Sequence, residues 1–138
     1  MIKVYSKIKE GLLLHQVLRS DEWSNKEGRV NLVDGEQFLQ CASLNLKAGV
    51  TFKPHKHNRV ERKGYGVAQE AWIVLRGKVK CIFYDLDDQI ISEIILEAGD
   101  ASFTFYGGHN YLILEDNSLI LEFKVGPYVS QELDKTFI

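Results

Sequence analysis

Two of the four histidines stand two positions apart, in the segment Pro54-His55-Lys56-His57. Residues two apart in an extended segment point to the same face, so the imidazoles of His55 and His57 can bind one metal ion together. The alternative is a pair of solvated histidines beside a polar loop. The pair by itself therefore indicates a site for a divalent ion and leaves that alternative open. His15 lies far from the pair, in the apolar run Leu12–Leu18, and is expected to be a core or surface histidine rather than a ligand.

The segments that must position such side chains have the pattern of β-strands. Short alternating runs rich in Val, Ile, Phe, Tyr and Leu are separated by glycines or by turns rich in Asp and Asn. They predict strands at Phe38–Leu46, Ala71–Leu75, Lys78–Tyr84, Ile90–Leu96, Ala101–Phe105, Tyr111–Leu114 and Ser118–Val125. Many short strands at spacings of about 8–12 residues predict a single antiparallel sandwich or barrel.

The remaining segments are less regular. One helical turn, capped by Ser20, is expected within residues 20–28. The polar stretch Lys56–Ala68 contains Gly64 and Gly66 and is expected to be a loop. We therefore predict one all-β domain over residues 1–138, with the strands of an N-terminal extension in residues 1–37 and the barrel core in residues 38–138.

Length and composition restrict the class of protein. The chain has 138 residues, 45% of them hydrophobic, and a net charge of −2, which argues against nucleic-acid binding driven by bulk electrostatics. No segment approaches the roughly 20 apolar residues that cross a bilayer, and the N-terminus lacks the apolar core of a signal peptide. We therefore expect a cytoplasmic protein without membrane association. Cys41 and Cys81 each lie in an apolar run and are expected to be small buried hydrophobes rather than a disulfide or a metal pair.

The spacing around the histidine pair resembles the motifs of the cupin superfamily. Its first motif is G-x5-H-x-H, a short gap and then E-x6-G, and this chain reads GVTFKPHKH and then EAWIVLRG. Its second motif is G-x5-P-x-G-x2-H-x3-N, and this chain reads GDASFTFYGGHNY. Twelve residues separate His57 from Glu70, and the resemblance accommodates them as an enlarged loop, Asn58–Gln69, at the mouth of the barrel.

A narrower resemblance covers roughly residues 38–138. The block Glu70–Gly77, the wide loop after the histidine pair, and the tail Leu121–Tyr128 with Asp134–Phe137 look like those of small cupin-fold metalloproteins encoded in bacterial polysaccharide loci. The locus context implies, by association, work on sugars or nucleotide-sugars.

The cupin resemblance implies a small antiparallel β-barrel, or jelly-roll, in which His55, His57, Glu70 and His109 bind one divalent metal ion. Gln69 adjoins Glu70, and because adjacent strand residues face opposite ways only one of them reaches the site; the ionised carboxylate is the better ligand. Three neutral imidazoles and one carboxylate suit Fe, Mn, Ni, Co or Zn as the divalent ion. Four ligands leave about two positions open on an octahedral ion, for water or an anionic substrate.

Several residues beside the motifs have two possible roles each. Trp72 shares a face with Glu70, and it either packs in the barrel or stacks on a sugar. Tyr111 and Tyr106 are the candidates for a catalytic role, and Tyr111 either fills the barrel or donates a proton. The basic residues of the mouth loop are either solvated or hold a phosphate or carboxylate; they are Arg59, Arg62 and Lys63.

Three hypotheses for the function follow. The first is a small metal-dependent enzyme acting on a sugar-related or other small oxygenated substrate. The second is a non-catalytic metal- or sugar-binding cupin, and the third is a metal-free nucleotide-sugar isomerase with His109 and Tyr111 as its acid/base pair. A homodimer is also expected, because cupin barrels commonly pair through edge strands and the aromatic tail Phe123–Tyr128 would cover such an edge.

Overall fold

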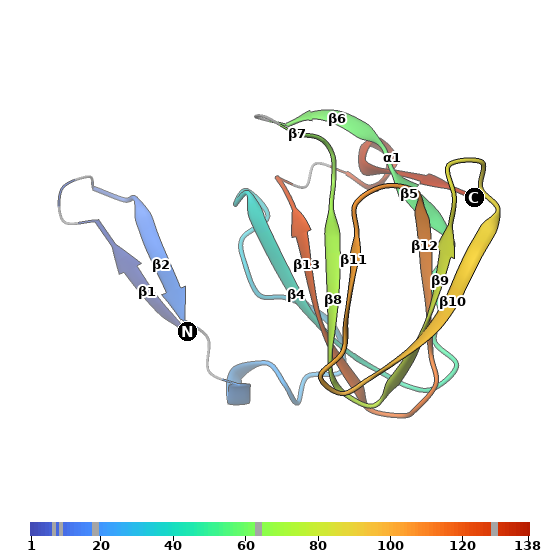
Figure 1. The fold of residues 1–138 in the computed structure, drawn as a ribbon. Helices are drawn as coiled ribbons and strands as arrows, with labels where there is room; N and C mark the ends of the chain where they lie inside the picture. Colours follow the sequence, from blue (N-terminus) through green and yellow to red (C-terminus); the bar gives the residue numbers. More distant parts are fainter. Residues whose placement is uncertain (7, 9, 18–19, 63–64, 128–129) are drawn as a thin grey trace.

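The computed structural model describes residues 1–6, 8, 10–17, 20–62, 65–127 and 130–138. Two antiparallel five-stranded sheets face each other as a sandwich (Figure 1). Sheet I has the order β10 (Ile90–Glu97), β9 (Lys78–Tyr84), β12 (Gly108–Ile113), β5 (His55–His57), β14 (Lys135–Phe137). Sheet II has the order β11 (Ala101–Thr104), β8 (Glu70–Arg76), β13 (Ser118–Val125), β4 (Leu39–Leu46), β3 (Gly28–Asn31). Within the described residues no ladder joins the two sheets, so the sandwich is open at its sides.

The chain crosses between the sheets most abruptly at Gly77. This residue alone separates β8 of sheet II from β9 of sheet I. Its φ is +84°, and a Cβ atom at this position would lie 2.8 Å from the backbone Cα of Ser118. Glycine is therefore required here both for the left-handed backbone and for the close approach of two strands.

The interior changes from apolar at the Gly77 end of the sandwich to polar at the opposite end. The inward-facing side chains of three strands show this change. Listed from the Gly77 end to the opposite end, they are Val74, Trp72 and Glu70 in β8, Ile113, Tyr111 and His109 in β12, and Ile120, Glu122 and Lys124 in β13. The buried core cluster comprises Leu44, Trp72, Val74, Val79, Cys81, Leu96, Tyr111, Ile113 and Ile120. A dry core at one end thus supports a polar interior at the other.

The all-β prediction is confirmed. Each of the seven predicted strands matches an observed strand, with boundaries that agree to within three residues. The turns rich in Asp and Asn that were expected between strands include residues 85–88 and 115–117, which separate β9 from β10 and β12 from β13. Cys81 lies in the core and Cys41 is partly exposed, and both are free thiols.

Two expectations were wrong. The predicted loop Lys56–Ala68 contains most of β5 and a hairpin of β6 (Arg59–Arg62) and β7 (Tyr65–Val67). The tail does not cover a sheet edge, because β13 carries Phe123 to Val125 in the middle of sheet II, paired with β4 on one side and β8 on the other. Tyr128 lies outside the described residues. The single helical turn expected within residues 20–28 is present as a 3-10 turn at Ser20–Glu22.

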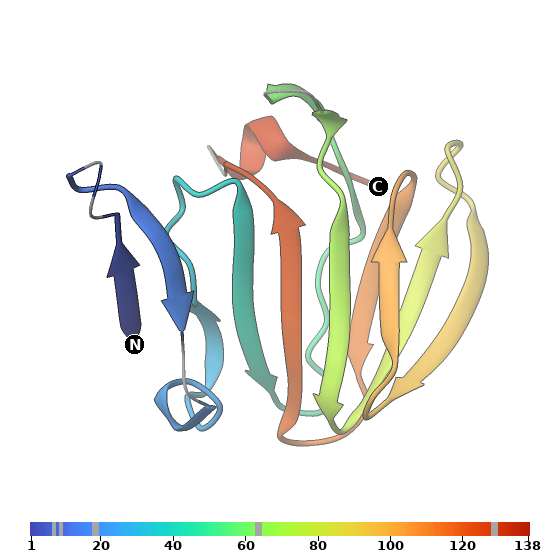
Figure 2. The same ribbon diagram turned by 60° about the vertical axis from the view of Figure 1, so that its left-hand side comes forward.

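The N-terminal extension is only partly separate from the sandwich. β1 (Ile2–Tyr5) and β2 (Leu13–Val17) form an antiparallel hairpin that stands to one side of the two sheets (Figure 2). β3, which precedes residue 38, pairs with β4 and so belongs to sheet II. The sandwich therefore begins about ten residues earlier than the predicted barrel core. In the part of the chain that the structure describes, no helix has the length and apolar character to span a membrane.

Candidate metal centre

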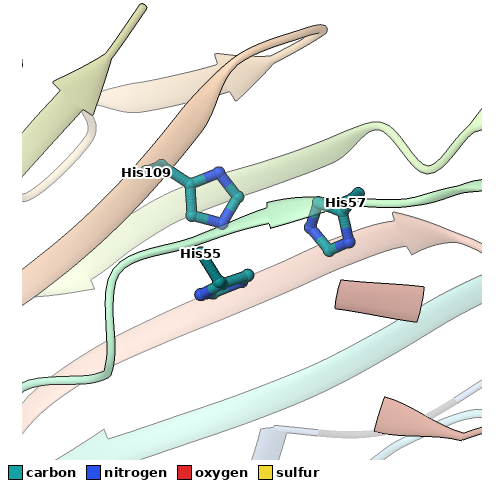
Figure 3. Close-up of side chains that lie close together, drawn as sticks. All are labelled: His55, His57 and His109. Atoms are coloured by element: carbon teal, nitrogen blue, oxygen red, sulfur yellow. The ribbon is translucent and has the colours of Figure 1, made fainter. Parts of the chain in front are cut away.

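Three buried histidines converge inside the polar end of the sandwich. One ring nitrogen from each of His55, His57 and His109 lies within 4.8 Å of the corresponding atoms of the other two. Their rings point toward one another from two neighbouring strands of sheet I (Figure 3). Their relative exposures are 7%, 8% and 0%, so water reaches them little. This burial excludes the alternative of two solvated histidines.

Strand geometry explains the convergence. His55 and His57 are two apart in β5 and share its inward face. His109 in β12 pairs directly opposite His55 in the antiparallel ladder, and directly paired residues also share a face. Glu70, the first residue of β8, reaches the same space from sheet II, with its Oε1 3.3 Å from His109 Nε2 and its Oε2 3.4 Å from His57 Nε2. The cluster therefore connects the two sheets.

Each histidine is oriented through its second nitrogen. His55 Nδ1 lies 2.9 Å from the backbone oxygen of Lys53, and His57 Nδ1 lies 3.2 Å from Oδ2 of Asp134. Both oxygens accept hydrogen bonds, so each Nδ1 carries the hydrogen and each Nε2 presents a lone pair to the cluster. His109 Nδ1 lies 3.1 Å from the hydroxyl of Thr104, which can accept in the same way. Partners of this kind orient histidine ligands in metal sites.

The ring nitrogens at the centre have no hydrogen-bond partner among the described residues. The same holds for one oxygen of Glu70, and the four buried atoms are Nε2 of His55, His57 and His109 and Oε2 of Glu70. Buried polar atoms are almost always hydrogen-bonded, so a group of four is exceptional. Because a carboxylate oxygen and a neutral Nε2 both present lone pairs, they repel unless a proton or a metal cation lies between them.

The donor set fits a divalent transition metal. Metal–nitrogen bonds of about 2.0–2.1 Å place two ligands of one ion at most about 4.2 Å apart. Three ligands cannot all lie opposite one another, so three nitrogens on one ion lie closer together than this limit, and the separations of up to 4.8 Å must contract when a metal binds. Imidazole with carboxylate suits Fe, Mn, Ni, Co or Zn, and one carboxylate against a 2+ ion leaves a charge of +1 for a further anionic ligand.

Electrostatics keep two of these groups in the form that binds metal. Burial, reinforced by the positive charge of Lys135 and by His109, lowers the pKa of His55 from 6.5 to about 3, so its ring is neutral at pH 7. Burial alone raises the pKa of Glu70, but hydrogen bonds from His109 and His57, in the state where a proton lies between each Nε2 and the carboxylate, outweigh burial and hold that pKa well below its ordinary value. Glu70 is therefore ionised at neutral pH.

Trp72 and Tyr111 both pack in the interior, which is one of the two roles expected of each. Trp72 is 2% exposed and stacks on Tyr111 with ring centroids 3.8 Å apart. The indole Nε1 of Trp72 also donates to Oε1 of Glu70 at 2.9 Å, which fixes the orientation of the carboxylate. The Tyr111 hydroxyl pairs with Ser102 at 3.1 Å, and burial raises the pKa of Tyr111 well above its ordinary value. This environment weakens the case for Tyr111 as an acid/base partner of His109.

The other candidates lie farther out. Tyr106 is 73% exposed and lines a cavity of about 170 Å³ that His57 also borders, so it stands at an entrance rather than in the cluster. The side chains of the basic mouth residues and of His15 lie outside what the structure describes; the mouth residues are Arg59, Arg62 and Lys63.

Sequence reasoning missed the residues that orient the histidines. Asp134, which is 2% exposed, ends the short helix α1 (Gln131–Asp134) immediately before β14. Thr104 lies in β11 and is paired with Glu70 in the neighbouring strand. Asp134 lies 77 positions from His57 along the chain, so no local spacing could have identified it.

Replacing Asp134 by asparagine is expected to weaken metal binding by about 10–100-fold. The amide nitrogen of asparagine can donate to His57 Nδ1, which would move the ring hydrogen to Nε2 and remove the lone pair that faces the cluster. Competition with a chromophoric chelator measures the change. The matched control is Ser130→Ala, which removes the hydroxyl that caps the same helix at Leu133 without touching His57. Equal losses in both variants would mean that helix stability, rather than ring orientation, controls affinity.

Comparison with known proteins shows which fold the chain has. No family model matches the sequence, and no curated protein is significantly similar to it. A cupin-2 domain protein from Shewanella frigidimarina matches with a TM-score of 0.52 and 16% identity, over 74% of this chain and 84% of that one. The capsular polysaccharide assembling protein CapF from Staphylococcus aureus matches with a TM-score of 0.59 and 18% identity, over 80% of this chain. Oxalate decarboxylase from Bacillus subtilis matches with a TM-score of 0.59 and 16% identity, over 82% of this chain.

These matches differ in how much of the partner they cover. The chain spans 34% of CapF and 28% of oxalate decarboxylase, so in both cases it corresponds to one part of a longer protein. At such identities the likeness establishes the architecture, and the chemistry of the site has to be argued from its own residues.

Proposed function

We propose that this chain, which has the cupin fold, binds one divalent metal ion through His55, His57, His109 and Glu70 and is a small metal-dependent enzyme. The observation that carries the proposal is the group of four buried ligand atoms that lack hydrogen-bond partners and face a common centre. Fe, Mn, Ni, Co and Zn all suit this donor set. The metal would act as a Lewis acid on an oxygen of the substrate.

The substrate we propose is a small, oxygenated and sugar-related molecule. CapF, which shares the fold, is a capsular polysaccharide assembling protein, and oxalate decarboxylase shows that the same fold serves a small oxygenated acid. A cavity of about 330 Å³ has room for a small molecule, and its lining includes Lys124 and Lys135, which pair across the strands with Glu70 and His57. A filled, dry interior would have favoured a non-catalytic metal protein instead.

The chain's own residues have separable roles in this proposal. Asp134, Thr104 and the backbone of Lys53 hold the three imidazoles in place, and Trp72 holds the carboxylate of Glu70. Because the ligands come from strands of both sheets, each is held by its own ladder, which keeps the centre rigid. The apolar core beneath the centre excludes water from one side, so substrate must enter from the polar end.

The deciding experiment is metal analysis of protein purified without added metal, followed by a substrate screen with the metal that is found. We expect one equivalent of a transition metal per chain, and turnover that disappears after chelation and returns when that metal is restored. A protein that takes up no transition metal under any condition would refute the proposal, and the metal-free isomerase would then become the leading hypothesis.

We further propose that the protein is a cytoplasmic homodimer. Exposed apolar side chains gather on the edge strands β10 and β11 and just beyond β11, among them Ile91, Ile94, Ile95, Phe103 and Phe105. Clusters of this kind often mark interaction surfaces. Sedimentation velocity at micromolar concentration is expected to give twice the 15.8 kDa chain mass, and a monomer would contradict the expectation.

A further inference from the structure

The C-terminal segment, residues 130–138, lies across the polar end of the sandwich, with α1 beside β6 and β14 paired with β5 (Figure 1). α1 has four residues and β14 has three, and β14 is an edge strand of sheet I. Helices of fewer than about 12 residues are marginal by themselves in water, and elements with few buried contacts open readily. The position of this segment therefore depends on the residues that it contacts.

The segment contacts the surroundings of all three histidines of the cluster. The contacting pairs are Asp134 with the ring of His57, Phe137 with Lys53, whose backbone oxygen orients His55, and Ile138 with Gly108, which precedes His109. The first pair is a direct hydrogen bond of 3.2 Å between Nδ1 of the imidazole and Oδ2 of the carboxylate. Docking of residues 130–138 therefore bears on the orientation of the ligands, and on that of His57 most directly.

Asn58, the residue that follows β5, holds this segment through its backbone and its side chain. Its backbone N–H donates to the backbone oxygen of Asp134 at 2.7 Å. Its side-chain Nδ2 donates to the backbone oxygens of Leu133 and Glu132, at 3.2 and 3.4 Å, and its Oδ1 accepts from the hydroxyl of Thr136. One asparagine thus fixes the chain on both sides of Asp134.

The link from Asn58 to the metal centre passes through Asp134. With the chain fixed on both sides of this residue, its carboxylate accepts the hydrogen of His57 Nδ1, and the lone pair of Nε2 is directed to the cluster. A metal ion on Nε2 draws electron density from the ring and makes Nδ1–H a stronger donor, so the ion strengthens the same hydrogen bond. By thermodynamic linkage, the docked segment tightens metal binding by the factor by which the metal tightens docking.

We infer that Asn58 is a positioning residue for the metal centre: it docks residues 130–138 on β5 so that Asp134 orients His57, and metal binding in turn locks this segment in place. The inference rests on the proposed function, because it needs a metal ion at the histidine cluster. It adds that metal affinity depends on a short segment that opens more often in the metal-free protein.

The first test replaces Asn58 by alanine, which removes three side-chain hydrogen bonds and leaves the backbone bond to Asp134. The dissociation constant for Zn²⁺, measured by competition with a chromophoric chelator, should rise by about tenfold, the lower end of the range for outer partners of metal ligands. The matched control is Asn45→Ala, which also removes an amide that donates to a backbone oxygen, that of Ser24, and should keep the wild-type affinity. A purely structural role for Asn58 would lower the melting temperature and leave the dissociation constant unchanged.

The second test measures hydrogen exchange of residues 130–138 by mass spectrometry, without Zn²⁺ and at saturating Zn²⁺. In the wild type Zn²⁺ should slow exchange in this segment by about tenfold or more, because the ion and the docked segment stabilise each other. Asn58→Ala should exchange faster in both states and still be slowed by Zn²⁺. Asp134→Ala removes the link itself, so Zn²⁺ should no longer change exchange in this segment. Slow exchange across β8 and β13 in every variant would show that the sandwich is folded.

The outcomes separate this inference from the proposed function. Equal exchange of residues 130–138 with and without Zn²⁺, in a wild type that binds the ion, would overturn the inference and leave the metal centre in place. An Asn58→Ala protein with wild-type affinity for Zn²⁺ would overturn it as well. A wild type that binds neither Zn²⁺ nor any other transition metal would instead refute the proposed function, and the inference would fall with it.

Discussion

Replacing His57 by alanine is expected to reduce bound metal from stoichiometric to a trace, with the sandwich still folded. The substitution deletes one of the three Nε2 atoms that face the centre, together with the contact to Asp134. Loss of a ligand should cost more than the about 10–100-fold in affinity that loss of an outer partner costs. The apolar core at the opposite end of the sandwich does not include His57, so folding should persist.

The matched control is Lys56→Ala in the same strand. Lys56 points to the outer face, where its ammonium lies 2.8 Å from Asp88, so this variant should hold metal as the wild type does. A chelator should then lower the melting temperature of the wild type and of Lys56→Ala but leave His57→Ala unchanged. The expected stabilisation by metal is about 4 kcal/mol when free metal exceeds the dissociation constant about 1,000-fold. A His57→Ala protein with wild-type metal content would mean that the ligand set is wrong.

Replacing Gly77 by alanine should be among the most destabilising single substitutions in the chain. The left-handed backbone at φ +84° costs an alanine about 1–2 kcal/mol. The new methyl group would also meet Ser118 Cα and Cβ, both at 2.8 Å, and overpacking of this kind costs about 1–3 kcal/mol. Urea denaturation should therefore show a loss of roughly 2–5 kcal/mol in the free energy of unfolding.

Gly99→Ala separates the two causes. Gly99 also has positive φ, +98°, but a Cβ atom there would meet nothing within 4 Å. This variant should lose only the backbone contribution, about 1–2 kcal/mol. If both alanine variants lost the same amount, the contact with Ser118 would not contribute, and the tight crossing between the sheets would depend on backbone conformation alone.

The strands could be predicted because most of them bury one face only. In β8 the alternation of Trp72 and Val74 with partly exposed neighbours is the pattern of a half-buried strand. The hairpin β6–β7 was missed because its strands are short and their apolar residues, Val60, Tyr65 and Val67, are separated by charged residues and glycines, so no sustained alternation marks it. Its pairing depends on the fold around it rather than on its own pattern.

The histidine pair could be predicted for a local reason, but its surroundings could not. His55 and His57 share a face by spacing alone, whereas Asp134 and Lys135 reach them through the pairing of β14 with β5 from the far end of the chain. Glu122 and Lys124 alternate with Leu121 and Phe123, a pattern typical of a strand whose polar face meets solvent. In the structure that polar face points into the sandwich, because Glu122 and Lys124 line an interior cavity there rather than meeting solvent.

The single-residue crossing at Gly77 also limits how this gene can change in length. β8 is anchored at one end by Gly77 and delivers Glu70 at the other, so the interval between them sets the face on which the carboxylate emerges. Inserting or deleting one residue would turn Glu70 outward, since successive strand residues face opposite ways. A change of two residues would restore the face but move the carboxylate by about 7 Å along the strand, out of reach of the histidines. Insertions and deletions are therefore expected to be tolerated in the hairpin turns, such as residues 85–88, but not between Glu70 and Gly77.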